Sequence, residues 1–318
     1  MTVKKLTFVR AFAPASVANV GCGFDVLGFA IDGPGDEIEA RLTGNRGVII
    51  SQIDGEGGKL PYETEKNTAG KAVMSLLNSL KTPLKNGIDL KIHKKMPLGS
   101  GLGSSAASSV AAAVAVNRLL GEPYSRKDLL PFVIDGEYAA SGSPHADNVA
   151  ASLLGGFILV RSNDPLDVIS LPCPKDLYCT IIHPRIEIAT KQTRQILRKQ
   201  VSLSKAVEQW GNVGAMVAGL FKNDIDLIGR SMQDVIVEPT RSFLIPGFQK
   251  MKEAVLDHGA VGFSISGAGP SVFALSKSEE IAKKVGSGAG EVLEELGLDY
   301  DIIISAINEK GAFIKDEQ

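Results

Sequence analysis

The sequence has 318 residues, of which 44% are hydrophobic and 22% charged, and its formal net charge is −2. A chain of this length and ordinary composition folds as one large globular domain or as two smaller ones. The balanced charge, without a basic stripe, argues against a nucleic-acid partner, and the lack of any run of about 20 apolar residues argues against a membrane-spanning helix.

The first half of the chain alternates predicted strands and helices. Two loops in it are rich in small and polar residues: Pro14–Asp25, which carries Asn19 and Asp25, and Ser141–Asn148. Pro131 is expected to kink or restart the helix in which it lies. Strands are predicted at residues 8–13, 36–42, 47–53, 88–93 and 155–160, and helices at 68–80, 104–120 and 125–138.

Helix-breaking residues are densest at Asn163–Pro165 and Leu171–Pro174, so we expect a domain boundary there, between residues 1–165 and 166–318. The alternation of strands and helices with short turns indicates an α+β fold. In the second half, strands are predicted at 178–183, 261–265, 271–275 and 301–307. Helices are predicted at 190–200, 204–221 and 279–296, and one more helix is predicted to end near residue 258.

Three cysteines without the spacing of a metal site indicate a reduced, cytoplasmic environment. The four histidines are scattered along the sequence, and they give no sign of a zinc site.

The segment Pro97–Ser108 is the most informative part of the sequence. Gly99, Gly101 and Gly103 allow tight bends and a close approach of the backbone to a ligand. The alanine-rich run that follows is predicted to be a helix, and a glycine loop at a helix N-terminus presents free N–H groups and a partial positive charge. The expected ligand is a phosphate.

Two common phosphate loops do not fit this spacing. A P-loop requires a lysine after its last glycine, whereas Ser104 follows Gly103. The dinucleotide fingerprint requires a third glycine where Ser104 stands, so a dinucleotide-dependent oxidoreductase is disfavoured.

The segment from Pro97 to Ala107 resembles the ATP-binding motif of the GHMP kinases. The segments Pro14–Asp25 and Ser264–Ser271 resemble the first and third motifs of that family, in the same order. Within the family, Pro14–Gly28, Ser143–Ala150 and Glu238–Arg241 resemble the branch that phosphorylates the side-chain hydroxyl of L-homoserine.

The resemblance implies a two-domain α+β fold, with an N-terminal domain like ribosomal protein S5 domain 2 and a ferredoxin-like α/β sandwich as the C-terminal domain. It also implies ATP and Mg²⁺ as cofactors, a step of threonine biosynthesis, and a homodimer. The residues it assigns to ATP are Pro97, Leu98, Gly99, Ser100, Gly101, Leu102, Gly103, Ser104, Ser105, Ala106, Ala107, Asn67, Thr190 and Gly267.

The resemblance also assigns the metal and acceptor residues. Ser105 and Glu137 match the positions that hold Mg²⁺, a cation that takes one or two protein oxygens together with phosphate and water. Homoserine is a zwitterion, and arginines suit its carboxylate because they bind it in a forked geometry. The residues matched to the acceptor are Asn19, Asp25, His145, Arg194 and Arg241.

The reacting centre is assigned to Asp147, Asn148 and Arg241. Asp147 falls at the position of the aspartate base of mevalonate kinases, but no lysine clearly matches the partner of that base. We therefore expect catalysis by positioning and charge neutralisation, with the proton passing to phosphate or water.

Two other functions remain open from the sequence. The first is a kinase of the same family that acts on another small alcohol, of mevalonate or shikimate type, because both arginines suit any carboxylated acceptor. The second is a nucleotide-binding relative without turnover, although the presence of both expected metal ligands argues against it.

Overall fold

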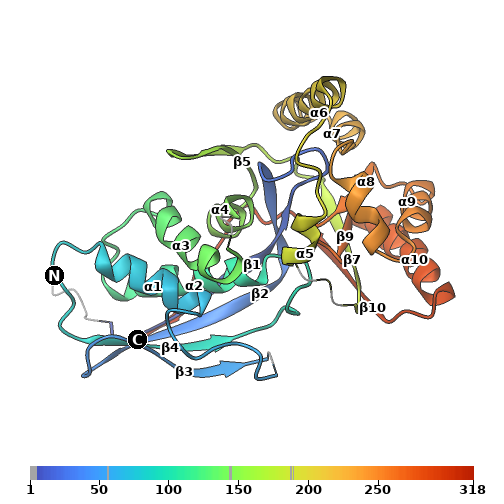
Figure 1. Cartoon of the computed structure of the whole chain (residues 1–318). Helices are drawn as coiled ribbons and strands as arrows, with labels where there is room; N and C mark the ends of the chain where they lie inside the picture. Colours follow the sequence, from blue (N-terminus) through green and yellow to red (C-terminus); the bar gives the residue numbers. More distant parts are fainter. Residues whose placement is uncertain (1–5, 56, 143–144, 187, 189) are drawn as a thin grey trace.

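The computed structural model describes residues 6–55, 57–142, 145–186, 188 and 190–318, except for the side chains of residues 140, 141 and 190–192. Two β-sheets and the helices that cover them make up these residues (Figure 1). The α+β class predicted from the sequence is confirmed.

The larger sheet contains seven of the described strands. Its main path has the order β11-β1-β2-β4-β3, and the hairpin of β5 and β6 joins it through β2. Only the β3–β4 pair among the pairs described is parallel. Its strands are β1 (Phe8–Ala18), β2 (Leu27–Thr43), β3 (Val48–Asp54), β4 (Gly87–His93), β5 (Phe157–Asn163), β6 (Leu166–Leu171) and β11 (Phe313–Glu317).

Four α-helices lie on one face of this sheet (Figure 1). The alanine-rich α2 is buried along almost its whole length, because it packs against β1 and β2 on one side and against α1 and α3 on the other. Small side chains permit this close packing on every face. The helices are α1 (Thr68–Asn78), α2 (Ser104–Leu119), α3 (Leu130–Ser141, after the 3₁₀ turn Lys127–Leu129) and α4 (Ala146–Leu154).

The smaller sheet has the order β10-β7-β9-β8, and each neighbouring pair is antiparallel. When these four strands are numbered 1 to 4 along the chain, their order across the sheet is 4-1-3-2, which is the order of a ferredoxin-like sandwich. Helices α9 and α10 pack on it and on each other. The elements of this part are β7 (Tyr178–Pro184), α5 (Thr190–Gln195), α6 (Leu203–Lys222), α7 (Ile225–Ser231), α8 (Glu238–Arg241), a 3₁₀ turn (Ser242–Leu244), α9 (Phe248–Asp257), β8 (Gly262–Ile265), β9 (Val272–Ser276), α10 (Glu279–Glu295) and β10 (Tyr300–Ala306).

An aromatic cluster joins the two sheets. The ring of Phe29 in β2 lies 4.8 Å from that of Phe157 and 5.7 Å from that of Phe273 in β9, measured between centroids. All three side chains are fully buried. The long strand β2 therefore serves both parts, with its first half in the junction and its second half in the larger sheet.

The structure corrects several boundaries predicted from the sequence. The expected loop Pro14–Asp25 begins within β1, which continues to Ala18. The expected loop Ser141–Asn148 is shorter, since α3 ends at Ser141 and α4 begins at Ala146; residues 143 and 144 lie outside the described residues. Strands β6 and β11 and helices α4, α7 and α8 were not predicted.

The predicted division between residues 165 and 166 falls in the turn of the β5–β6 hairpin, both strands of which belong to the larger sheet. The C-terminal strand β11 returns to the same sheet beside β1. In the part of the chain that the structure describes, no helix is long and apolar enough to cross a membrane.

Candidate active site

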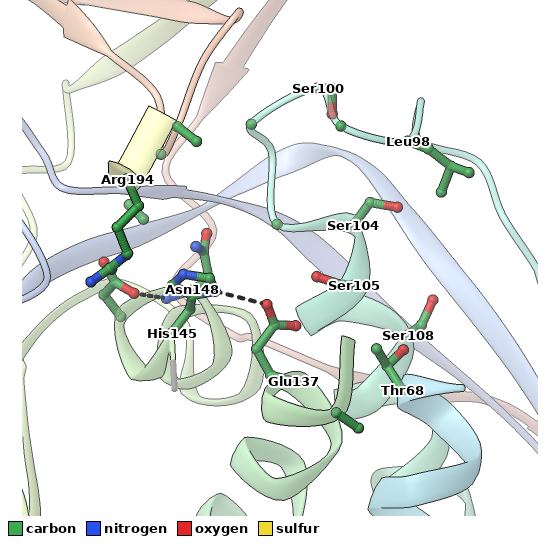
Figure 2. A pocket seen from close by; sticks show the side chains of 18 of the residues that line it. Thr68, Leu98, Ser100, Ser104, Ser105, Ser108, Glu137, His145, Asn148 and Arg194 are labelled. Carbon is green, nitrogen blue, oxygen red and sulfur yellow. Dashed lines mark hydrogen bonds and ion pairs between the residues drawn. The ribbon is translucent and has the colours of Figure 1, made fainter. Parts of the chain in front are cut away.

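A cavity of about 610 Å³ lies where the two parts of the molecule meet (Figure 2). The glycine loop and the start of α2 line one side of it. The loop after β1, the start of α4, and residues from α5 and α8 line the other. Elements that are far apart in the sequence therefore present their functional side chains to one space.

The glycine loop has the conformation that its composition predicts. Gly99, Gly101 and Gly103 all have positive φ, between 67° and 81°, a region that side chains disfavour. A Cβ at Gly101 would lie 2.5 Å from the carbonyl oxygen of Ser266, and one at Gly103 would lie 2.2 Å from Ser16 Oγ. Backbone atoms at Gly101 and the side chains of Ser16 and Asn148 at Gly103 therefore leave no room for a Cβ at these two positions.

The third motif supports this loop from outside. Ser266 Oγ donates to the carbonyl of Gly101 at 2.7 Å, and Ser271 N donates to that of Ser100 at 3.3 Å. The carbonyl of Gly267, in turn, accepts hydrogen bonds from Asn19 Nδ2 at 2.6 Å and Arg241 Nη1 at 3.0 Å. One turn thus connects the glycine loop with two of the expected acceptor residues.

A buried ion pair that sequence reasoning missed lies beneath the loop. Lys94 and Asp36 are both buried and in direct contact. Lys94 Nζ also donates to the carbonyl of Ser104 and to Ser108 Oγ, each at 2.8 Å, while Ser108 Oγ donates to Asp36 at 2.8 Å. The pair therefore fixes the first turn of α2 to the end of β4.

Glu137 of α3 and His145 before α4 form a second polar contact, with 2.9 Å between Oε1 and Nδ1. Burial alone would lower the pKa of His145, but the hydrogen bond to Glu137 and the charge of that carboxylate raise it. Figure 2 shows the side chains of Ser105 and Glu137 directed toward the same part of the cavity.

On the opposite side, two arginines surround the ring of Phe24. The guanidinium carbons of Arg194 and Arg241 lie 5.5 Å and 5.1 Å from its centroid, within the range of cation–π attraction. Arg194 Nη2 also donates to both oxygens of Asp25, at 2.8 and 3.0 Å. Burial, together with the charge of Arg194, lowers the pKa of Arg241 to about 10.

Asp147 and Asn148 lie in the first turn of α4 and line the cavity. Asp147 is buried and accepts a hydrogen bond from the backbone N–H of Asn148 at 2.9 Å. Burial raises its pKa to about 6, although the charge of His145 opposes this shift. Asn148 Oδ1 accepts from Ser16 Oγ at 2.9 Å and lies beside Gly103, next to the glycine loop.

The cavity brings together most of the residues that the sequence singled out. Those that line it are Asn19, Asp25, Asn67, Leu98, Gly99, Ser100, Gly101, Gly103, Ser104, Ser105, Glu137, His145, Asp147, Asn148, Arg194, Arg241 and Gly267.

Other expected residues lie elsewhere. Leu102, Ala106 and Ala107 are buried in the hydrophobic core beneath the loop, and Pro97 is exposed. Thr190 is the first residue of α5, and its side chain lies outside the described residues.

Sequence reasoning missed Phe24, Lys94 and Ser108, which also line the cavity, and an apolar wall formed by Leu60, Pro61 and Ile92. Phe24 lies within the first motif, so its position next to Asp25 was a usable signal. Lys94 gave none, because a lysine after a strand is most often exposed.

Among the described residues, no group of three or more His, Cys, Asp or Glu side chains could hold a metal ion by itself. The cavity is lined by a glycine loop at a helix N-terminus, two arginines and single carboxylates, a set that is typical of phosphoryl transfer to a small anionic or zwitterionic acceptor.

Comparison with known proteins shows the family to which the chain belongs. The family model "GHMP kinases N terminal domain" matches residues 67–156, and "GHMP kinases C terminal" matches residues 216–295. The homoserine kinase of Chlorobium phaeobacteroides (strain DSM 266 / SMG 266 / 2430) is 49% identical, and the match covers 96% of this chain and 98% of that protein. The chain belongs to the GHMP kinase family.

Solved structures place the fold in the same family. The crystal structure of homoserine kinase from Cytophaga hutchinsonii is 55% identical, with a TM-score of 0.95, and the match covers 99% of this chain and 98% of that one. A mevalonate kinase from L. major is only 17% identical, with a TM-score of 0.67 over 96% of this chain and 97% of that one, and shares the fold. The expected two-domain fold of the family is confirmed.

The buried carboxyl of Asp147 leads to a prediction about stability. Its pKa is about 6 in the folded protein against a usual 3.8, so the folded state holds this proton to higher pH than the unfolded chain does. Ionisation of Asp147 therefore lowers the free energy of unfolding of the wild type as pH rises from 3.8 to about 6. The whole loss is present only above this range. We expect Asp147→Asn to gain stability relative to the wild type between about pH 4 and about pH 7.

Urea unfolding at several pH values measures this difference, with the exposed Asp257→Asn as the matched control. If the stability difference between Asp147→Asn and the wild type is the same across this range, burial does not perturb the carboxyl of Asp147.

Proposed function

We propose that this chain is an ATP-dependent homoserine kinase, which transfers the γ-phosphoryl group of ATP to the side-chain hydroxyl of L-homoserine. The observation that carries the proposal is that one cavity joins a phosphate-binding glycine loop to an arginine–aspartate cluster suited to an amino-acid zwitterion. Relatives named homoserine kinase, 42–55% identical over nearly the full chain, support the choice of acceptor.

The nucleotide phosphates would lie on the glycine loop at the N-terminus of α2. The hydroxyl of Ser100 supports this placement, because it is buried beside the cavity and has no hydrogen-bond partner among the residues that the structure describes. The wall of Leu60, Pro61 and Ile92 offers an apolar surface to the adenine ring. Asn67 holds this region in place, since its side chain caps α1 and donates to the carbonyl of Pro61 at 2.9 Å.

Ser105 and Glu137 are the residues that would hold Mg²⁺. A buried carboxylate beside a hydroxyl at a phosphate-binding helix N-terminus is a donor set that suits this cation. When bound, Mg²⁺ would neutralise charge on the phosphate oxygens. The hydrogen bond from His145 fixes the orientation of the Glu137 carboxylate.

The acceptor would lie between the glycine loop and the arginines. Arg194 and Arg241 supply forked donors for its carboxylate, and Arg241 Nε is buried without a hydrogen-bond partner among the described residues. Asp25 supplies an acceptor for its ammonium group. Phe24 keeps both guanidinium groups on the same side of the cavity through their stacking on its ring.

In the reaction, the acceptor hydroxyl oxygen forms a bond to the γ-phosphorus while the bond from that phosphorus to the β–γ bridging oxygen breaks. ADP leaves, and the hydroxyl proton passes to a phosphoryl oxygen or to water. We infer that Asn148 and Arg241 position the reactants and that Asp147 supports the start of α4 instead of removing the proton. Alignment of the reactants and neutralisation of charge then supply most of the rate.

The same proposal places the enzyme in the cytoplasm as a homodimer, in a step of threonine biosynthesis. The reduced state that the three free cysteines indicate is consistent with that compartment.

A coupled assay of ADP release tests the choice of acceptor. We expect turnover with L-homoserine in the presence of Mg²⁺, loss of turnover when the cation is chelated, and much weaker activity with mevalonate, shikimate or galactose. Arg194→Lys should raise KM for homoserine about tenfold or more, because it removes the forked contact. The exposed Arg185→Lys is the matched control. Preference for another acceptor would refute the assignment, and ATP binding without any turnover would indicate a non-catalytic relative.

The Asp147→Asn variant tests the role of that carboxyl in catalysis. We expect kcat to fall less than about tenfold, since a true general base contributes typically 10²–10⁴-fold. The measurement is kcat with homoserine as a function of pH. A fall of about a thousandfold, with loss of an inflection near the pKa of about 6, would instead make Asp147 the base.

A further inference from the structure

Helix α6 carries an exposed apolar stripe that the proposed activity does not use. Figure 1 shows this helix at the outer edge of the molecule, with α7 beside it. Leu203 is 72% exposed, Val207 50%, Trp210 57% and Phe221 66%. Single exposed apolar side chains are ordinary on soluble proteins, but a contiguous exposed apolar patch marks an interaction site.

The stripe is continuous along the helix. Its members are Leu203, Val207, Trp210, Gly214, Val217 and Phe221, at alternating spacings of four and three residues. Val217 is half-buried against the core of the chain and forms an edge of the stripe, whereas the other five residues are exposed. That spacing is the heptad pattern of a helix that packs along another helix. The inner side of α6 is already used, since Gln209, Met216 and Leu220 are buried against the rest of the chain.

The charged residues of α6 itself do not lie on the stripe. The charged residues of α6 are Lys205, Glu208 and Lys222, and the helical repeat places all three on other sides of the helix. A partner helix would therefore meet apolar and small side chains along its whole length.

Two glycines within α6 indicate where the partner would come closest. A Cβ at Gly211 or at Gly214 would meet nothing within 4 Å, so packing inside this chain does not require glycine at either position. Glycine in a helix interior costs about 1 kcal/mol relative to alanine. A large side chain from another molecule, seated on Gly214, would account for this residue.

The stripe is also symmetrical about residue 212. Running two copies of α6 antiparallel about this point sets Leu203 opposite Phe221, Val207 opposite Val217, and Trp210 opposite Gly214. Each residue then meets the same partner in both copies, as a two-fold axis requires. Trp210, the bulkiest side chain of the stripe, thus faces Gly214 of the other copy, and this contact occurs once on each side of the two-fold axis.

From this pattern we propose that α6 forms a two-fold interface with α6 of a second copy of this chain. Taking about 200 Å² for a large aromatic side chain, Trp210 and Phe221 together would remove roughly 250 Å² per copy from water. Two copies therefore remove about 500 Å² through these residues alone, a large share of the roughly 1,200 Å² of a stable interface. Leu203, Val207 and their surroundings add to this area.

Light scattering after gel filtration, at micromolar protein, tests the interface. We expect the wild type to have twice the 33.6 kDa mass of the chain and Trp210→Glu to have the mass of one chain, because two carboxylates would be buried near the axis. Phe243→Glu is the matched control, since Phe243 is 87% exposed and lies outside α6. A monomeric wild type, or a Trp210→Glu protein that remains a dimer, overturns the proposal.

A cysteine pair tests the antiparallel register independently, with little risk to folding because both positions are exposed. Leu203→Cys/Phe221→Cys should form dimers linked by disulfides under mild oxidation. Leu203→Cys alone and the wild type should not, because the two copies of residue 203 would lie about 27 Å apart along the helices, too far for a disulfide. Linkage of the single variant, or none in the double variant, contradicts the register.

Discussion

The buried ion pair between Asp36 and Lys94 is the contact on which the proposed phosphate-binding side of the cavity depends. Lys94 follows β4 directly, and its ammonium group also binds the carbonyl of Ser104, the first residue of α2. Residues 95–103 therefore form a loop whose two ends are joined by one buried side chain. Breaking a buried pair on one side leaves an uncompensated charge, at a cost of about 3–5 kcal/mol, so the loop ends are held firmly.

Hydrogen bonds to backbone carbonyl groups connect the proposed acceptor side of the cavity to the glycine loop. Asn19 and Arg241 both donate to the carbonyl of Gly267, in the turn that also supports the glycine loop. From the other side, Gln209 of α6 donates to the carbonyl of Cys22 at 2.7 Å and to Asp234 at 3.0 Å, and Asp234 accepts the N–H groups that lead into α8. The helix that we propose as an interface thus also supports the loop that carries Asp25 and the entry into α8, which carries Arg241.

Sequence reasoning predicted the parts of the site whose residues lie within short segments. The glycine loop could be located because three glycines at alternate positions before an alanine-rich helix have few other uses, and the first and third motifs were located by their resemblance to those of the GHMP kinases. The Asp36–Lys94 pair could not, since its members are 58 positions apart and charged residues are usually exposed. Strand β11 was missed because its five residues, Phe-Ile-Lys-Asp-Glu, are mostly exposed and resemble a polar tail. Helix α4 was missed because the proline and serines before it resemble a loop.

Nucleotide affinity of Asp36→Asn, measured by calorimetry with a non-hydrolysable ATP analogue, tests the dependence of the site on the buried pair most directly. The substitution leaves Lys94 without its counter-charge, so the start of α2 and the glycine loop should lose their fixed geometry. The account predicts at least about a tenfold loss of affinity for the analogue, or about 1.4 kcal/mol, with the affinity for homoserine unchanged. Unaltered nucleotide affinity in a folded Asp36→Asn protein would contradict it.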